Sequence, residues 1–128
     1  HDKGNRHTRA KAVFELVARH ESRLANILLD YLNDSPDIRL LGQDQAAPGQ
    51  RAATVAFHTR AMPSAVIAKR LADHGIGVGA GDFYARRCVE ALGMDPDDGV
   101  VRVSMVHYNT PEEVERLVTV LDDILQAA

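Results

Sequence analysis

Cysteine and aromatic residues are scarce in this sequence, and long hydrophobic runs are absent. It contains one cysteine, no tryptophan, three tyrosines and three phenylalanines. A single cysteine excludes a disulfide within the chain, which fits a reducing cytoplasm. No apolar run approaches the ~20 residues that cross a bilayer, and no basic segment followed by an apolar leader is present. We therefore predict a cytoplasmic protein without membrane partners.

Charge and histidine are present but not concentrated. Lys and Arg total 15 against 18 for Asp and Glu, and the basic residues are dispersed, which argues against a nucleic-acid partner. The six histidines are scattered without ligand spacing, so no metal site is predicted. The partner we expect is a small molecule or another protein.

The 128 residues, 45% of them hydrophobic, suit one domain with its own core. Apolar periodicity predicts the element order α-β-β-α-β-α-β-α. The predicted helices cover about 9–33, 63–74, 82–92 and 111–126, and the predicted strands cover 38–42, 52–59, 76–78 and 100–106. This is an α+β fold with a small, mainly antiparallel sheet of three to four strands and helices packed on one face.

The last predicted strand carries a charge at an unexpected place. Val101, Val103 and Met105 alternate onto one face, while Arg102 and Ser104 point to the other. Because burying an unpaired charge costs several kcal/mol, Arg102 must reach water, an anion or another protein surface. We expect Arg102, Ser104 and His58 to lie on a face that no helix of this chain covers. A helix follows, with Thr110 as N-cap, Pro111 in the first turn and Glu113 closing a capping box.

Two stretches carry a resemblance to a known family. RVSMVHYNTPEEVERLV and, before it, GIGVGAGDFYA resemble the C-terminal small domain of class V aminotransferases and cysteine desulfurase-like enzymes, and the resemblance extends over most of residues 10–126. These enzymes use pyridoxal 5′-phosphate (PLP) and act on amino acids. The similarity includes isopenicillin-N-epimerase-like members, and it implies a homodimer as the full-length enzyme.

The resemblance also implies site residues. Arg102 takes the place of the arginine that binds the substrate carboxylate. Tyr84 and His107 are the other expected substrate-binding residues, although His107 fits a surface turn equally well. The active-site loop is expected to contain Gly79, Gly81 and Asp82.

The one cysteine does not match the catalytic cysteine of the desulfurases. In that family the cysteine follows the loop glycine by three residues, and counting from Gly81 gives Tyr84. The loop also has Gly79 where the family has an arginine. Cys88 is predicted to lie buried within the helix at 82–92, on the same face as Tyr84. Epimerase, lyase or transaminase chemistry is therefore expected rather than desulfuration.

The sequence is expected to be a fragment. It opens HDKGNRHTRA without an initiator methionine, and we expect residues 1–9 to be poorly ordered. None of its three lysines, Lys3, Lys11 and Lys69, follows a histidine as the cofactor lysine of the family does. No catalytic residue is expected in this fragment, and the cofactor lysine is expected upstream, in a PLP-binding large domain. The isolated fragment is expected to bind no PLP and to be inactive.

Other interpretations remain open. Arg102 could be a solvated residue on an open sheet face, and the chain could be a stand-alone α+β protein-interaction module without catalysis. GIGVGA formally fits a dinucleotide fingerprint, but a helix is predicted before it where that motif needs a strand. The motif is better explained as a glycine bend into the active-site loop.

Overall fold

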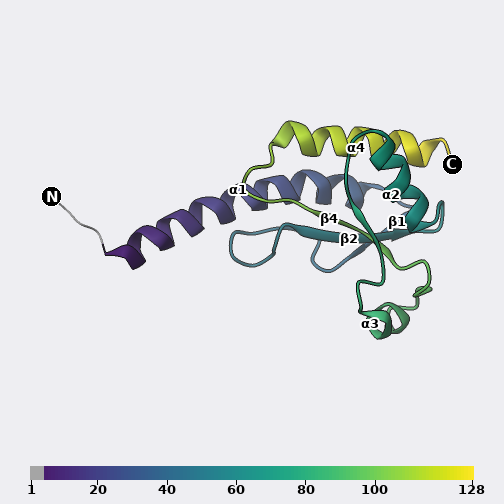
Figure 1. Cartoon of the computed structure of the whole chain (residues 1–128), viewed down its shortest axis with the longest axis horizontal. Coiled ribbons are helices and arrows are strands. Elements are labelled where there is room, and N and C mark those ends of the chain that lie inside the picture. The colour runs from purple at the N-terminus through teal and green to yellow at the C-terminus, as the bar shows by residue number, and fades with distance from the viewer. Residues whose placement is uncertain (1–4) are drawn as a thin grey trace.

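The structure, a computed structural model, describes residues 5–128 as four helices and one four-stranded sheet (Figure 1). The helices are α1 (Arg6–Asp34), α2 (Ser64–Asp73), α3 (Arg86–Ala91) and α4 (Pro111–Gln126). The strands are β1 (Ile38–Leu41), β2 (Thr54–Thr59), β3 (Gly79–Gly81) and β4 (Val100–Ser104). Among these residues no helix has both the length and the apolar character to cross a bilayer.

The sheet has the strand order β1-β2-β4-β3, and all three pairings are antiparallel. The predicted α+β class and element order are confirmed. β1 and β2 pair antiparallel as a hairpin across the loop 42–53. β4, the strand of Arg102, is an inner strand between β2 and β3.

The main core lies between one face of the sheet and helices α1, α2 and α4, which Figure 1 shows on the same side. The predicted alternation in β2 and β4 holds, because Val55, Phe57, Val101 and Val103 are all buried there. The helices contribute fully buried leucines and an isoleucine to the same cluster: Leu24, Leu28, Leu29, Ile67, Leu71 and Leu121.

α4 begins as the sequence predicts. The Thr110 hydroxyl accepts a hydrogen bond from the Glu113 backbone N–H at 3.3 Å, and the Glu113 carboxylate accepts one from the Thr110 N–H at 3.0 Å. This capping box fixes the chain direction immediately after β4.

A second, smaller apolar cluster lies on the opposite face of the sheet. Val89 of α3 and Met94 pack there with Val100, against Leu41 and Ala56. Figure 1 shows α3 across the sheet from α1 and α4. The expectation that no helix covers this face is therefore wrong for the end near Val100, whereas Arg102 and Ser104 on the same face are exposed.

The strand predicted at 76–78 instead forms three residues later, as β3 at Gly79–Gly81. The backbone N–H of Ile76 bonds to the Leu71 carbonyl at 3.0 Å, closing the end of α2 around Gly75, which has a φ of 74°. Because residues 74–76 complete this helix end, pairing with β4 begins only at Gly79.

Helix starts differ from prediction at three places. Asp82 caps no helix, and α3 begins four residues later at Arg86. Pro63 is the N-cap of α2, which begins at Ser64. α1 begins at Arg6, inside the segment expected to be poorly ordered, whereas Lys3 and the rest of 1–4 lie outside the described residues.

Candidate functional site

Arg102 is an exposed side chain on an inner strand. Its strand neighbours Val101 and Val103 are buried in the main core, so Arg102 points to the opposite face. The register places it opposite Ala56 of β2 and Gly79 of β3. Within residues 5–128 the guanidinium pairs with no carboxylate. A charged, exposed and unpaired guanidinium is free to bind an anion.

The guanidinium of Arg102 lies against an aromatic ring. Its Cζ atom is 3.9 Å from the ring centroid of Phe83. This is within the distance of a favourable cation–π contact. The ring occupies space that a side chain at position 79 would need, because a Cβ built on Gly79 lies 2.8 Å from Phe83 Cζ. The predicted loop glycine thus makes room for the ring beside Arg102.

The loop after β3 is held in a sharp turn. Phe83 and Tyr84 have positive φ angles of 50° and 61°, which residues with side chains rarely adopt. The Asp82 carboxylate accepts a hydrogen bond from the Tyr84 backbone N–H at 3.0 Å, and the Asp82 carbonyl accepts one from the Ala85 N–H at 2.8 Å. Asp82 therefore orders the loop rather than capping a helix. Tyr84 precedes α3 and is fully exposed.

A close glycine contact lies at the end of β3 from which this loop leaves. Gly81 pairs with Val100, and Gly99, with a φ of 68°, lies so close that a Cβ there would overlap the Gly81 carbonyl. The two backbones approach where the loop after β3 leaves the sheet.

His107 is separate from the Arg102 region. It is exposed beyond the end of β4 and makes an edge contact with Tyr108, with ring centroids 5.5 Å apart. The neighbouring Asn109 has a structural role: its side-chain oxygen accepts from the Val106 N–H at 2.9 Å, and its amide donates to Glu113 at 3.0 Å. The structure thus brings Arg102 and Gly79 together, and places Tyr84 and His107 on exposed turns at other points.

Asp98, in the loop before β4, contacts both α2 and β2. Its carboxylate accepts a hydrogen bond from the Ser64 backbone N–H at 2.8 Å, and lies 3.3 Å from the Ser64 hydroxyl and 3.2 Å from His58 Nε2. Pro63 gives α2 no side-chain cap, so Asp98 caps this helix from a distant loop. Through His58 it also connects α2 to β2.

Cys88 lies on an exposed position of α3, which contradicts its predicted burial. The buried residue of this short helix is Val89. Cys88 and Tyr84 do not share a helical face, because Tyr84 lies outside α3.

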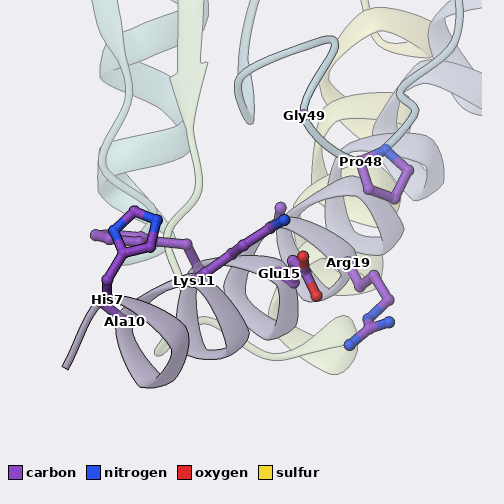
Figure 2. A pocket seen from close by; sticks show the side chains of 9 residues that line it. His7, Ala10, Lys11, Glu15, Arg19, Pro48 and Gly49 are labelled. Carbon is purple, nitrogen blue, oxygen red and sulfur yellow. The ribbon is translucent and has the colours of Figure 1, made fainter. Parts of the chain in front are cut away.

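A hollow of about 640 Å³ lies beside the first half of α1. Figure 2 shows His7, Lys11, Glu15 and Arg19 along the helix and Pro48 from the β1–β2 loop across from it. None of the predicted site residues lines this hollow. Nearby, Val13, Phe14 and Leu16 are exposed.

A match to a protein-family model shows the family of this chain. The class V aminotransferase model matches residues 6–117. The chain belongs to the class V aminotransferase family. The match includes β3, β4 and the loop between them, so Arg102, Gly79 and Phe83 all lie within the family region.

Individual relatives include aminotransferase-like and cysteine desulfurase-like proteins. An aminotransferase-like protein of Gibberella zeae is 35% identical over 116 residues, covering 90% of this chain and 29% of that protein. A cysteine desulfurase-like protein of Aspergillus flavus is 36% identical over 115 residues, which cover 88% of this chain and 26% of that protein. This class V chain therefore spans about a quarter of the length of these relatives.

Solved structures of cysteine desulfurases contain a part with the same fold as this chain. A cysteine desulfurase of Thermococcus onnurineus superposes with a TM-score of 0.76 at 26% identity, over 88% of this chain and 26% of that one. The Escherichia coli cysteine desulfurase CsdA superposes with a TM-score of 0.71 at 27% identity, over 85% of this chain and 25% of that one. The α+β fold of this class V chain is thus the fold of one part of these enzymes.

The sequence did not reveal the contacts of Phe83 and Asp98. Phe83 gave no periodic signal because it lies in a left-handed turn, although the stretch GAGDF places it four residues after Gly79. Asp98 lies outside every predicted helix and strand, and its partner Ser64 is 34 residues away in sequence. Such a contact can be read only from the fold.

Proposed function

We propose that this chain is the substrate-carboxylate-binding C-terminal domain of a PLP-dependent enzyme acting on an amino acid, with Arg102 as the carboxylate receptor. Membership of the class V family supports an enzyme of this kind. The observation that carries the residue assignment is the exposed guanidinium of Arg102, without a carboxylate partner among residues 5–128. A planar guanidinium suits bidentate binding of a carboxylate.

Neither of the two lysines among the described residues lies beside Arg102 to hold PLP there. Lys69 is exposed on α2 and pairs with Asp73 at 3.3 Å, and Lys11 is exposed on α1. Both helices pack on the face of the sheet opposite to Arg102. In the proposal the cofactor, which supplies the electron sink for carbanion chemistry, is held by a large domain outside this chain. The chain contributes recognition of the substrate and part of the loop that encloses it.

The first half of α1 supports a larger assembly. It projects beyond the sheet in Figure 1 and exposes Val13, Phe14 and Leu16 beside the hollow of Figure 2. Adjacent exposed apolar side chains are typical of a surface that another protein part covers. The proposed large domain is such a part. A homodimer and a cytoplasmic location remain predictions.

We further propose a reaction other than cysteine desulfuration. Tyr84 stands at the position expected for the desulfurase cysteine, and Cys88 lies four residues later, on α3. Epimerisation, elimination or transamination would need no thiol nucleophile from this loop. An isopenicillin-N-epimerase-like activity belongs to this group.

The exposed apolar residues of α1 also favour a second candidate, a stand-alone interaction module without catalysis. The two candidates differ in what surrounds the chain in the complete protein. A large domain with a histidine-lysine pair upstream is expected for the enzyme. A complete protein whose N-terminus lies near residue 1 would support the module instead.

Arg102→Ala in the complete enzyme tests the proposal. Loss of a charge-assisted bidentate contact costs about 2–5 kcal/mol, so the KM for the amino acid should rise more than tenfold. Arg102→Lys should recover part of this loss, because an ammonium lacks the planar fork. Arg87→Ala is the matched control, since it removes an exposed guanidinium from α3. A lower melting temperature for Arg102→Ala with an unchanged KM would make Arg102 a structural residue.

A further inference from the structure

The surroundings of Arg102 restrict its side chain on one side. Phe83 lies with its ring centroid 3.9 Å from Arg102 Cζ, and it approaches from the β3 side, where Gly79 has no side chain. On the β2 side the neighbour is Ala56, which is too short to confine a guanidinium. Phe83 is therefore the side chain that limits where the guanidinium can lie.

The ring is itself held in place. Phe83 packs against the cluster of Val89, Met94 and Val100, which lies between α3 and the sheet. Its backbone is fixed in a positive-φ turn by the two hydrogen bonds that Asp82 accepts. An unusual backbone conformation persists where the surrounding structure determines it, and such residues cluster at ligand sites.

The contact leaves the anion-binding capacity of Arg102 intact. A ring contact uses the face of the guanidinium carbon, whereas the N–H donors lie at the edge of the group. Within residues 5–128 these donors have no side-chain or backbone acceptor. The contact thus reduces the rotamer freedom of Arg102 without consuming its hydrogen-bond donors. A receptor ordered before binding loses less entropy when its ligand arrives.

We propose that Phe83 is a positioning residue that pre-orders Arg102 for the substrate carboxylate, and that Gly79 is required because it leaves space for the ring. This inference rests on the proposed function of Arg102. It makes the GAGDF stretch part of carboxylate recognition, through the ring of Phe83 rather than through direct contact with the substrate.

The test is steady-state kinetics of the complete enzyme with Phe83→Leu, Phe83→Tyr and Gly79→Ala. Phe83→Leu should raise KM about 3- to 10-fold, the range expected for ordering one long side chain, with kcat changed less than about twofold. Phe83→Tyr keeps the ring and should stay within about twofold of the parent KM. Gly79→Ala should raise KM like Phe83→Leu, because the added Cβ would displace the ring.

Val114→Ala is the structural control. Val114 of α4 is buried in the main core, on the face of the sheet opposite to Phe83, so its truncation should lower the melting temperature and leave KM unchanged. An equal rise in KM for Val114→Ala would mean that general loosening, not the ring contact, is responsible, and would overturn the inference. If Phe83→Leu does not fold, Gly79→Ala and Phe83→Tyr decide the question.

The double variant Phe83→Leu/Arg102→Ala separates this inference from the proposed function. If Phe83 acts through Arg102, Phe83→Leu should add no further rise in KM once Arg102 is alanine. An unchanged KM in Arg102→Ala alone would defeat the proposed function. Two outcomes would defeat the positioning role only, provided that Arg102→Ala raises KM. One is a parent-like KM in both Phe83→Leu and Gly79→Ala. The other is a double variant in which the effects of the two single substitutions on KM add fully.

Discussion

The carboxylate of Asp98 caps α2 by accepting a hydrogen bond from the Ser64 backbone N–H at 2.8 Å. Its second oxygen lies 3.2 Å from His58 Nε2 on β2. One loop residue thereby ties the start of a core helix to a strand of the sheet. It does so two residues before β4, the strand that carries Arg102.

Asp98→Ala should therefore destabilise the chain. Loss of the cap leaves the buried Ser64 N–H without its acceptor and should cost about 1–2 kcal/mol of unfolding free energy, measured by urea denaturation. Asp97→Ala is the matched control, since it removes the exposed side-chain pair with Arg86 and should cost less than about 0.5 kcal/mol. Equal losses in the two variants would show that Asp98 has no capping role.

Two glycines distinguish backbone strain from steric overlap. Gly93 and Gly99 have φ angles of 74° and 68°, but a Cβ on Gly93 meets nothing within 4 Å, whereas a Cβ on Gly99 overlaps the Gly81 backbone. Gly93→Ala should cost about 1–2 kcal/mol, the penalty of a left-handed alanine. Gly99→Ala should cost clearly more, about 3 kcal/mol or above, because backbone cannot move aside as a side chain can. Thermal unfolding of both variants would be measured, and equal melting temperatures would refute the close approach.

The capping box of α4 should contribute a pH-dependent stability. The hydrogen bond from the Asn109 side chain, and then that from the Thr110 backbone, hold the pKa of Glu113 below its usual value. A carboxyl group with a lowered folded-state pKa stabilises the fold above the unfolded-state pKa of about 4.3, and this stability is lost as pH falls through the folded-state value.

Glu113→Gln is the variant that exposes this dependence. It should melt below the parent at pH 7, and the gap should narrow as pH falls below about 4. Glu112→Gln in the same first turn serves as control, because Glu112 takes no part in the capping box. A gap for Glu113→Gln that stays constant from pH 7 to pH 2.5 would contradict the assignment.

Cys88→Ser should change neither the free energy of unfolding nor the activity appreciably. Burial would have predicted a loss of about 1–2 kcal/mol, but the exposed position on α3 reduces this to less than about 0.5 kcal/mol. In the complete enzyme, turnover should be retained because the proposed chemistry uses no thiol from α3. If a folded Cys88→Ser enzyme were inactive, the exclusion of desulfuration would have to be withdrawn.

Local patterns were sufficient for the parts of the fold that depend on local interactions. The alternation of Val101, Val103 and Met105 predicts their burial, and the Thr110–Glu113 spacing predicts the start of α4. The start of α3 was missed because Asp82 is a good N-cap in isolation. In the fold its carboxylate instead bonds to the Tyr84 N–H within a turn of positive φ.

The site was predictable in part. Strand periodicity placed Arg102 on the face away from the main core, and the family resemblance gave it a chemical role. The partner of Arg102 was not predictable, because Phe83 comes beside it only through the pairing of Gly79 with Arg102 across two antiparallel strands. Sequence periodicity carries no information about such a register.

Binding of a carboxylate by Arg102 is tested most directly with a matched pair of ligands. The dissociation constants of the amino-acid substrate and of its decarboxylated amine would be measured for the complete parent enzyme and for Arg102→Ala. The parent should prefer the amino acid more than tenfold, corresponding to at least about 1.4 kcal/mol, and Arg102→Ala should lose most of that preference while binding the amine as before. An Arg102→Ala enzyme that keeps the parent's preference for the carboxylate would contradict the account.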